Sequence, residues 1–449
     1  MLADNLQKLP AQYHWALADG ALLQAISRNE PMVRGTRGRL LGGLVKVSQY
    51  LGLAWPLISL AGMLELIRLL LRQHRSTQNG NRQDVHYPTC FFVGFGAGKE
   101  AELFSQYCEG QAGSVERLNQ LNVDSFSSWH CVGIMPGFRS LARALAVARM
   151  AIAALPSECA PWRAEYFTYI GMRAGYFAYM CAWFEILKKK TGIRLGEVAF
   201  LTGYIPAFAA VDAGLPTCYL QHGLIRHSTL LPAFMRAEAL TIEEADFIRH
   251  RSPETRVTTH VRPTHALIPS EMKREVLVAS IYEIPESGGG EYLSRIMPFI
   301  GWANTKSVPV RVRPHPCEDG TFWPAYEAAG HVAIEKCDEG FLQAIARLQP
   351  RLVVSWFSTA MHDALMCGVI PVSVCADDDR HVADMVYPLF RRCLRWPQDA
   401  DLIARLLDDD DYYELVLSRL RRGLSGAGAT EFLFEGPRLQ VCAKPEIGD

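Results

Sequence analysis

Seven residues at positions 310–316, VRVRPHP, join a short alternating segment to a histidine that lies between two prolines. Val308, Val310 and Val312 recur at every second position, which predicts a β-strand with one apolar face. Each proline fixes its own φ and restricts the residue before it, so His315 is expected to be extended and to have little conformational freedom. A rigid imidazole at a strand end is therefore the first candidate functional group.

The next unit, positions 351–374, reads as a strand, a hydroxyl-rich turn, a helix, a glycine and a second strand. This order predicts a βαβ unit. Its turn carries Ser355, Ser358 and Thr359 just before the helix, where hydroxyl and backbone N–H groups can hold a phosphate. Together with the rigid His315, this turn predicts a site for activated-sugar chemistry.

Length, charge and cysteine usage narrow the class of protein. The chain has 449 residues, which predicts two or three domains. Its net charge of −1 provides no overall basic field, so the composition gives no support for nucleic-acid binding. It has 12 cysteines, and none forms a CxxC pair, which favours buried reduced thiols in the cytoplasm over a zinc site or a disulfide framework. Residues 1–10 lack the apolar segment of a signal peptide.

An apolar segment at 51–71 contains only two charged residues, Glu65 and Arg68. Its length would allow a membrane span. However, Pro56 is expected to break the helix early, and Glu65 and Arg68 fall one turn apart on one face. A helix on the membrane surface, with Trp55 at the headgroup level, fits this pattern better than a span. A buried helix of the N-terminal domain is the third interpretation.

A polar, turn-rich stretch at 76–84 is the predicted linker to the first Rossmann-like domain. Beyond it, an apolar strand at 90–93 runs into a glycine-rich turn, GFGAGKE at 94–100, and then a helical pattern. The turn resembles GxGxxG only loosely and is not a P-loop, because Glu100 stands where a Ser/Thr should follow the lysine. It is either a tight turn that needs positive φ or a close approach of the backbone at Gly96 to an acceptor.

Two long helical patterns follow, at 141–154 and 164–190. The second is rich in aromatic residues, which at helical spacing predict a buried core face. A surface toward an acceptor lipid or sugar is the alternative. Predicted strands at 198–201 and 216–220 then flank a short helix.

The strand at 216–220 leads into the second candidate histidine, in the sequence Gln221-His222-Gly223. Ligands of open α/β sheets bind beyond the carboxyl ends of the strands, and His222 is expected to lie there. Gly223 allows a sharp turn behind it, and Gln221 supplies a neighbouring polar group. We therefore expect these three residues to line the acceptor side of a site.

The predicted fold class is α/β, with two Rossmann-like domains facing a cleft and an extra N-terminal helical segment. The expected boundaries are 1–85 for the helical segment, 86–270 for the acceptor domain, 271–425 for the nucleotide-sugar donor domain and 426–449 for a tail. Three aspartates at 377–379 fall in a predicted loop, where we interpret them as solvated rather than metal-binding.

The motifs RPHP at 313–316 and SWFST at 355–359 resemble those of GT-B glycosyltransferases of bacterial surface polysaccharide synthesis. Those most similar in motif use cytidine-activated donors. They are the sialyltransferases and polysialyltransferases, with an HP motif and a Ser-Ser/Thr motif, and the Kdo transferases. The chain also resembles the CDP-glycerol glycerophosphotransferases, which carry an HG histidine as well as an HP histidine. The resemblance covers about residues 195–380 and implies a GT-B fold.

The resemblance implies a role for each matching residue. His315 would bind the donor phosphate and act as general acid toward the departing CMP, and Pro316 would orient it. Arg313 would add positive charge beside the nucleotide, although it shares with Arg311 the strand face opposite the valines and is also interpretable as that strand's polar side. The phosphate would be held by hydroxyl and backbone N–H groups of Ser355, Ser358 and Thr359.

The resemblance does not identify the catalytic base. Sialyltransferases carry an acidic motif followed by glycine in the first domain, whereas here the comparable run at 318–320 follows the HP motif in the second domain. His222 is therefore the candidate base, by its position and its likeness to the HG histidine. Weaker alternatives are Glu243, Glu244 and Asp246.

The resulting hypothesis is transfer of a Kdo-like or sialic-acid-like sugar from a CMP-activated donor to a surface polysaccharide or lipid-linked glycan. The expected partners are the nucleotide-activated sugar, the glycan acceptor and the inner-membrane surface, with no nucleic acid. The expected location is the cytoplasm, peripheral to the inner membrane. No cofactor or metal is expected, because helix N-termini and histidine would stabilise the charge. Polyol-phosphate transfer from a CDP-linked donor, epimerisation of a UDP-sugar and a non-catalytic scaffold are the alternatives.

Overall fold

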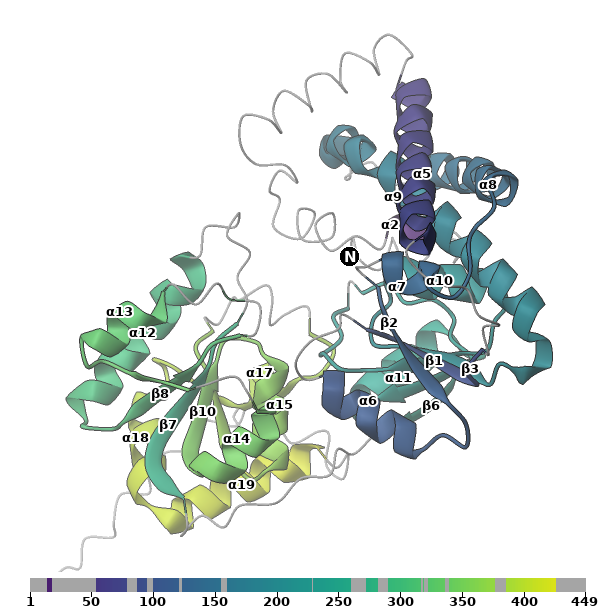
Figure 1. Ribbon diagram of the computed structural model, residues 1–449. Coiled ribbons are helices and arrows are strands. Elements are labelled where there is room, and N and C mark those ends of the chain that lie inside the picture. Colours follow the sequence, from purple (N-terminus) through teal and green to yellow (C-terminus); the bar gives the residue numbers. More distant parts are fainter. Residues whose placement is uncertain are drawn as a thin grey trace, which may run out of the picture. The chain divides into compact units, whose positions relative to one another are not determined.

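A computed structural model describes residues 14–17, 54–78, 87–94, 100–120, 123–154, 160–227, 229–259, 272–281, 290–315, 318, 322–335, 339–375 and 385–424. Contacts divide the chain into two compact units, Met1–Leu240 with Ala245–Thr259 and Thr241–Glu244 with His260–Asp449. Each unit is built on one six-stranded parallel sheet with helices packed against it (Figure 1). The pair of Rossmann-like domains expected from the sequence is therefore confirmed.

The sheet of the first unit has the strand order β2-β1-β3-β4-β5-β6, and every pairing is parallel. From β1 the chain builds β2 on one side and the later strands on the other, so the topological switch point lies between β1 and β3. Ligands of such sheets bind beyond the carboxyl ends of the strands at this point. The strands are β1 (Cys90–Gly94), β2 (Val115–Asn119), β3 (Glu197–Phe200), β4 (Thr217–Leu220), β5 (Arg236–Ala239) and β6 (Arg256–Thr259).

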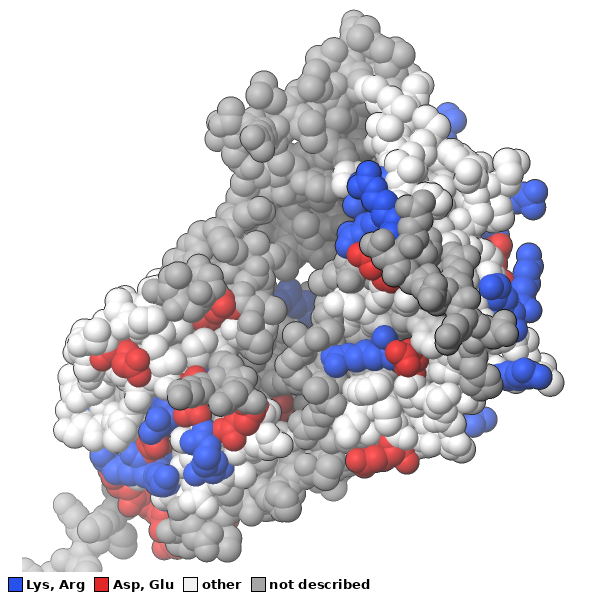
Figure 2. Space-filling view, in the orientation of Figure 1, with Lys and Arg blue, Asp and Glu red and all other residues white. Residues whose placement is uncertain are grey.

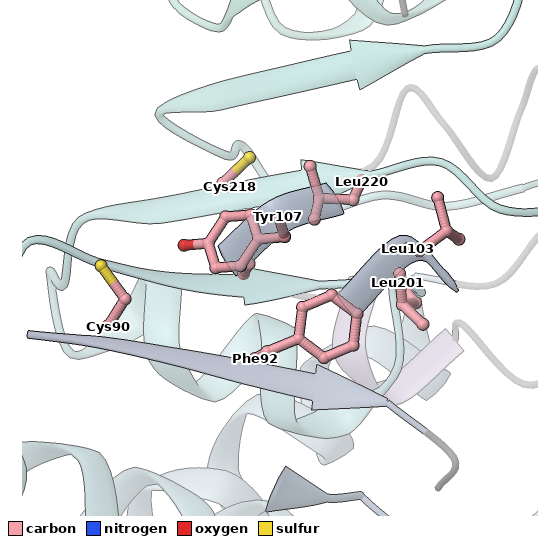
Figure 3. Packing of buried hydrophobic residues seen from close by; sticks show 8 residues of the cluster. Cys90, Phe92, Leu103, Tyr107, Leu201, Cys218 and Leu220 are labelled. Carbon is pink, nitrogen blue, oxygen red and sulfur yellow. The ribbon is translucent and has the colours of Figure 1, made fainter. Parts of the chain in front are cut away.

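Alternation along β1 directs its side chains into two layers of helices. Phe92 faces α6 (Glu100–Glu109), where its ring centroid lies 5.2 Å from that of Phe104. Phe91 points to the opposite face, 6.1 Å from the indole of Trp183 on α9 (Ala160–Thr191). Both faces of the strand are buried, which explains why β1 is a continuous apolar run. The cluster beneath α6 consists of Cys90, Phe92, Leu103, Tyr107, Ala199, Leu201, Cys218 and Leu220 (Figure 3).

The other helices before residue 260 complete this unit, and two of them form a bundle with α9. α5 and α8 both pack against α9 (Figure 1). These helices are α2 (His14–Leu17), α5 (Ala54–Gln78), α7 (Val123–Ser127), α8 (Ile134–Ala153), α10 (Ile205–Asp212) and α11 (Ile242–Arg251), with a 3₁₀ turn at Gly192–Arg194.

Three glycines bring α5 and α9 into close contact. A Cβ atom on Gly175 would lie 2.5 Å from the backbone oxygen of Gly62, and one on Gly171 would lie 2.6 Å from that of Ile58. A Cβ atom on Gly62 would in turn lie 3.0 Å from the backbone oxygen of Gly171. Because the two backbones touch, side chains are excluded at these positions. The long N-terminal helix is thus packed into the first unit.

The expectation that Pro56 breaks this helix is wrong. α5 begins at Ala54, so Pro56 lies in the first turn, where no intrahelical N–H bond is lost. The helix continues to Gln78 and takes in the start of the predicted linker at 76–84. Glu65 and Arg68 form the expected pair on one face, with a 2.7 Å contact.

The described aromatic side chains of α9 belong mainly to the core. Phe177, Tyr179, Trp183 and Phe184 are all buried. The ring of Trp183 stacks on His130, with 4.4 Å between the ring centroids. The core interpretation of the aromatic stripe is confirmed at these positions.

The sheet of the second unit has the strand order β12-β11-β10-β7-β8-β9, again entirely parallel. From β7 the chain adds β8 and β9 on one side and the remaining strands on the other, so the switch point lies between β7 and β10. The strands are β7 (Lys273–Ala279), β8 (Val310–Arg313), β9 (Ala333–Ile334), β10 (Pro350–Ser355), β11 (Ile370–Ser373) and β12 (Leu394–Arg395).

A tyrosine of the last described helix, Tyr413, forms hydrogen bonds at the start of β10 and β11. The hydroxyl of Tyr413 accepts the N–H of Ile370 at 3.0 Å and lies 3.0 Å from the backbone oxygen of Arg351 and 3.1 Å from that of Gly368. Gly368 has φ +87°, in keeping with its expected role as the end of the preceding helix. The helices are α12 (Gly290–Thr305), α13 (Trp323–Ala328), α14 (Phe341–Leu348), α15 (Thr359–Met366), α17 (Leu389–Arg392), α18 (Ala400–Asp408) and α19 (Asp410–Leu424).

The surface carries both signs of charge. Figure 2 shows acidic and basic side chains interspersed over the described residues of the visible face. This distribution agrees with the net charge of −1 and gives no extended basic field on that face.

Candidate functional site

The carboxyl ends of three neighbouring strands of the second sheet are level with one another. Ala279 pairs with Arg313 across β7 and β8, and Ser355 Oγ donates to the backbone oxygen of Ala279 at 2.7 Å. His315 follows Arg313 by two residues and Ser358 follows Ser355 by three, so both lie just beyond this edge. Neighbouring strands are about 4.8 Å apart, so the ends of β8 and β10 are separated by about 10 Å. The structure thus places His315 and the start of α15 on either side of β7, at the switch point.

A carboxylate organises the loop that carries His315. The backbone N–H of His315 donates to Glu318 Oε1 at 3.0 Å, and the N–H of Glu318 donates back to the His315 backbone oxygen at 2.9 Å. The other carboxylate oxygen accepts the indole N–H of the buried Trp323 at 2.9 Å. Glu318 therefore ties the histidine backbone to the core of this unit. Pro316 lies outside the described residues.

α15 begins at a hydroxyl cap. Ser358 is the N-cap, and its Oγ accepts the N–H of Ala360 at 3.2 Å. Thr359 is the first helical residue, and both hydroxyl side chains are half-buried. The positive end of the helix dipole favours an anion at this position. Ser358 and Thr359 are therefore placed where a phosphate can reach them.

Ser355 was expected to hold the phosphate, but in the structure its hydroxyl bonds to the backbone. Its side chain is fully buried, and its hydroxyl proton is used on the backbone oxygen of Ala279. The hydroxyl locks β10 to β7 beneath the edge, so we do not assign it to phosphate contact. Ser373 acts similarly, since its Oγ donates to the backbone oxygen of Trp356 at 2.8 Å.

The two arginines of β8 are also engaged within the unit. Arg311 Nε donates to Glu275 Oε1 at 2.7 Å. Arg313 is buried, and its guanidinium donates to the backbone oxygen of Glu339. The interpretation as the polar side of a strand accounts for both residues, and nucleotide contact is not needed to explain Arg313.

His222 lies directly beyond the carboxyl end of β4 in the first unit. Its Nδ1 is 3.0 Å from the backbone oxygen of Leu201, at the end of β3. A carbonyl oxygen can only accept, so Nδ1 carries a proton, and in the neutral ring the lone pair is on Nε2. This is a tautomer that can act as a general base.

Gln221 holds the turn that carries His222. Its Nε2 donates to the backbone oxygen of Gly223 at 2.8 Å, and its Oε1 accepts the N–H of Leu240 at 2.9 Å. Both ends of the buried amide are therefore occupied, and Gln221 positions the turn rather than offering an amide to an acceptor. The other glycine expected on the acceptor side, Gly96, lies outside the described residues.

Of the carboxylates considered as alternative bases, Glu244 and Asp246 have structural roles in or beside α11. Glu244 is fully buried, and its Oε2 accepts the hydroxyl proton of Thr241 at 3.0 Å. Asp246 pairs with Arg249 at 2.6 Å. Glu243 lies in the first turn of the same helix, where the helix dipole stabilises a carboxylate. His222 remains the candidate base at this edge.

Cysteines and acids form no metal cluster in the part of the chain that the structure describes. The aspartates at 377–379 lie outside those residues. Burial raises the pKa of the thiols of Cys181, Cys218 and Cys393 well above the ordinary value. These thiols stay protonated, so they are poor nucleophiles and poor metal ligands.

Two polar residues at these edges were not expected from the sequence. In the sequence, Glu318 stands out only as part of the acidic run at 318–320, although its spacing of three residues from His315 is a signal for a local cap. Gln120 follows β2, whose sequence VERLN has no apolar alternation that would identify a strand. Its position at a sheet edge therefore emerged only with the structure.

Comparisons with known proteins give likenesses of fold. No protein-family model matches the chain, and no curated protein matches it. Similar solved structures include TarM, at 11% identity and TM-score 0.36 over 54% of each chain. They also include MnaA from S. aureus with UDP, at 10% identity and TM-score 0.43 over 75% of this chain and 95% of that one. A UDP-GlcNAc 2-epimerase from Neisseria meningitidis bound to UDP-GlcNAc has 10% identity and TM-score 0.43 over 73% and 93%. The chain thus spans about half the length of TarM.

Proposed function

We propose that the chain is a glycosyltransferase that moves a Kdo-like or sialic-acid-like sugar from a CMP-activated donor to a surface polysaccharide or lipid-linked glycan. One observation carries this proposal: His315 and the Ser358 cap of α15 flank β7 at the switch point of the second sheet. A nucleotide phosphate bound there would meet a helix N-terminus on one side and an imidazole on the other. The motifs at these two positions are the ones that resemble the CMP-dependent transferases.

In the proposed reaction, residues of the second sheet stabilise the leaving group, and a residue of the first sheet acts as the base. As the bond between the anomeric carbon and the donor phosphate breaks, negative charge grows on the phosphate of CMP. The N–H groups at the start of α15, with the hydroxyls of Ser358 and Thr359, would stabilise that charge, and His315 would donate a proton to it. His222 would take the proton from the acceptor hydroxyl as that oxygen forms the new bond to the anomeric carbon. This scheme uses no metal ion and no further cofactor.

We also propose that α5 holds the chain on the cytoplasmic surface of the inner membrane. Leu57, Leu60, Leu64 and Leu71 are between 44% and 57% exposed. Their spacing of three, four and seven residues puts all four on one stripe of the helix. An 18-residue window within Ala54–Arg75 has a mean hydropathy of 1.6, and 28% of that window is buried. An exposed leucine stripe on a helix that is packed on its other side suits attachment to the lipid interface.

Vesicle binding tests the membrane proposal. The purified chain should sediment with phosphatidylglycerol vesicles, and Leu57→Ser with Leu64→Ser should abolish sedimentation. Leu415→Ser is the matched control, because Leu415 is an exposed leucine of α19 in the other unit. Equal sedimentation of the double variant and the control would rule out α5 as the attachment surface.

A donor screen tests the catalytic proposal. CMP-sugars, CDP-polyols and UDP-sugars are each supplied with and without a glycan acceptor, and nucleotide release and products are measured. Turnover of a CMP-sugar that requires the acceptor supports the proposal. Turnover of a CDP-polyol alone would replace it with polyol-phosphate transfer, and an epimer formed from a UDP-sugar without acceptor would replace it with an epimerase. Calorimetry that detects no nucleotide binding would indicate a non-catalytic scaffold.

The assignment of His315 has its own test. His315→Ala should remove most of the transfer activity while the fold, followed by circular dichroism, is retained. Near-normal transfer by a folded His315→Ala variant would reject the assignment.

A further inference from the structure

Three glutamine side chains are buried in the described part of the chain, and one of them is only half satisfied. Gln73, Gln120 and Gln221 are each at most 4% exposed. Gln73 and Gln221 use both ends of their amides in hydrogen bonds within the first unit. In Gln120, Oε1 accepts the hydroxyl proton of Thr202 at 3.1 Å, but Nε2 has no partner among the described residues. A buried N–H group without a partner is costly, so it calls for an explanation.

Gln120 lies at the switch point of the first sheet. Its backbone N–H donates to the backbone oxygen of Gly94, at the end of β1, at 2.8 Å. Its side chain reaches Thr202, which follows β3, the neighbour of β1 on the other side. His222 approaches the same segment from β4, through its contact with the backbone oxygen of Leu201. Because Leu201 and Thr202 are consecutive, the amide and the imidazole belong to one edge of the sheet, where α/β folds bind ligands.

The amide is held in place before any ligand arrives. The backbone oxygen of Gln120 accepts the hydroxyl proton of Tyr176 at 2.7 Å, and the backbone N–H is fixed by Gly94. Thr202 then orients the side chain, because its hydroxyl occupies Oε1 and turns Nε2 away from itself. A donor fixed on both its backbone and its side chain is preorganised for a ligand oxygen.

We propose that Gln120, oriented by Thr202, binds a neutral sugar hydroxyl of the acceptor beside His222. Within the described residues, the hydrogen-bond partners of Gln120 are Gly94, Tyr176 and Thr202, and none is charged. An uncharged donor suits a hydroxyl oxygen, whereas a carboxylate or phosphate is ordinarily recognised by Arg or Lys. The statement that this hydroxyl belongs to the acceptor rests on the proposed function, but binding of a sugar hydroxyl does not.

Three variants separate this role from a structural one. Gln120→Met removes the amide at nearly constant length, and Thr202→Val removes the hydroxyl that orients it at nearly constant shape. Gln73→Met is the matched control, since Gln73 is an equally buried glutamine of the same unit with both amide ends occupied. The labelled full-length chain is applied to an array of printed neutral oligosaccharides, and the thermal unfolding of each variant is measured alongside CMP release by the wild type.

Gln120→Met should keep the unfolding temperature of the wild type and lose roughly tenfold in oligosaccharide affinity, as expected for one hydrogen bond to an uncharged ligand. Thr202→Val should lose less affinity. Gln73→Met should unfold at a lower temperature than the wild type. Below its own unfolding temperature, it should bind the oligosaccharides with wild-type affinity. Wild-type affinity in Gln120→Met, or an unfolding temperature lowered as far as in Gln73→Met, would overturn the inference, as would a wild-type chain that binds no neutral oligosaccharide. A wild type that binds oligosaccharides through Gln120 but turns over no nucleotide sugar would instead reject the transferase and keep the hydroxyl site.

Discussion

The Nδ1 atom of His222 lies 3.0 Å from the backbone oxygen of Leu201, and this contact determines which ring nitrogen holds the proton. His222→Asn should preserve an N–H directed at Leu201 but lack a basic nitrogen. We expect transfer to fall by about 10²- to 10⁴-fold, as for loss of a general base, with little change in unfolding temperature. Transfer rates and thermal unfolding of the same preparation check this. A folded variant that transfers at more than a tenth of the wild-type rate would exclude His222 as the base.

The cap of α15 gives a prediction that separates stability from phosphate binding. Ser358→Ala should destabilise the chain by about 1 kcal/mol, because it removes an N-cap. Ser358→Asp keeps a capping oxygen but puts negative charge where the phosphate is proposed to bind, so its stability should match the wild type while nucleotide affinity falls. Calorimetric titration with CMP, alongside thermal unfolding, measures both. Normal CMP affinity in Ser358→Asp would place the phosphate elsewhere.

Glu318 is predicted to act through the position of His315. Glu318→Ala frees both the His315 N–H and the Trp323 indole, and the loosened loop should lower kcat by up to about 100-fold with little change in the KM for the donor. Glu318→Gln keeps one acceptor oxygen and should recover part of the activity. Steady-state kinetics and Trp323 fluorescence follow the two effects. Equal kcat values for Glu318→Ala and the wild type would show that this loop does not set the position of a reacting group.

A buried histidine makes stability depend on pH. His130 Nε2 donates to the backbone oxygen of Trp183 at 2.9 Å, and burial lowers the pKa of His130 from 6.5 to about 4. Between these values the unfolded chain binds a proton that the folded chain does not. The free energy of unfolding should therefore fall as the pH drops from 6.5 to 4, by up to about 3 kcal/mol from this group, and this contribution should level off below pH 4. Urea unfolding at several pH values should show a shallower slope for His130→Gln, and an unchanged slope would contradict the assignment.

Close packing of α5 on α9 predicts opposite effects for two identical substitutions. Gly175→Ala places a methyl group against the backbone oxygen of Gly62 and should destabilise the first unit by about 1–3 kcal/mol. Gly301→Ala, in α12, meets nothing within 4 Å and should stabilise the second unit by about 0.5–1 kcal/mol. Denaturant unfolding distinguishes them. Two effects of the same sign would mean that the helices separate easily enough to accept the methyl group.

Local signals explain which features the sequence could predict. His315 and His222 were expected at strand ends because proline and glycine mark those ends within a few residues. By contrast, β5 was not predicted, since Arg236 makes its short sequence RAEA look exposed. In the structure Arg236 pairs with Glu197 at 2.7 Å, a partner 39 residues away that no local pattern contains.

The same limit applies to hydroxyl groups within one motif. Ser355 and Ser358 share the SWFST turn, but only the end point of β10 decides that the first is buried and the second caps a helix. Gln120 is the extreme case, because its proposed role depends on an Nε2 that has no partner among the described residues. The surroundings of this amide can be recognised only in the folded sheet, where the ends of β1, β2 and β3 lie together.

The Tyr413 hydroxyl has a consequence for the order of synthesis. It accepts the N–H of Ile370 and lies beside the backbone oxygens of Arg351 and Gly368, so two strands of the second sheet are completed by a group from the last described helix. A nascent chain that has not yet released residue 413 from the ribosome must hold those strands without this contact. The first unit, whose sheet ends at Thr259, can mature first, whereas the second unit gains its full stability only after residue 413 has emerged.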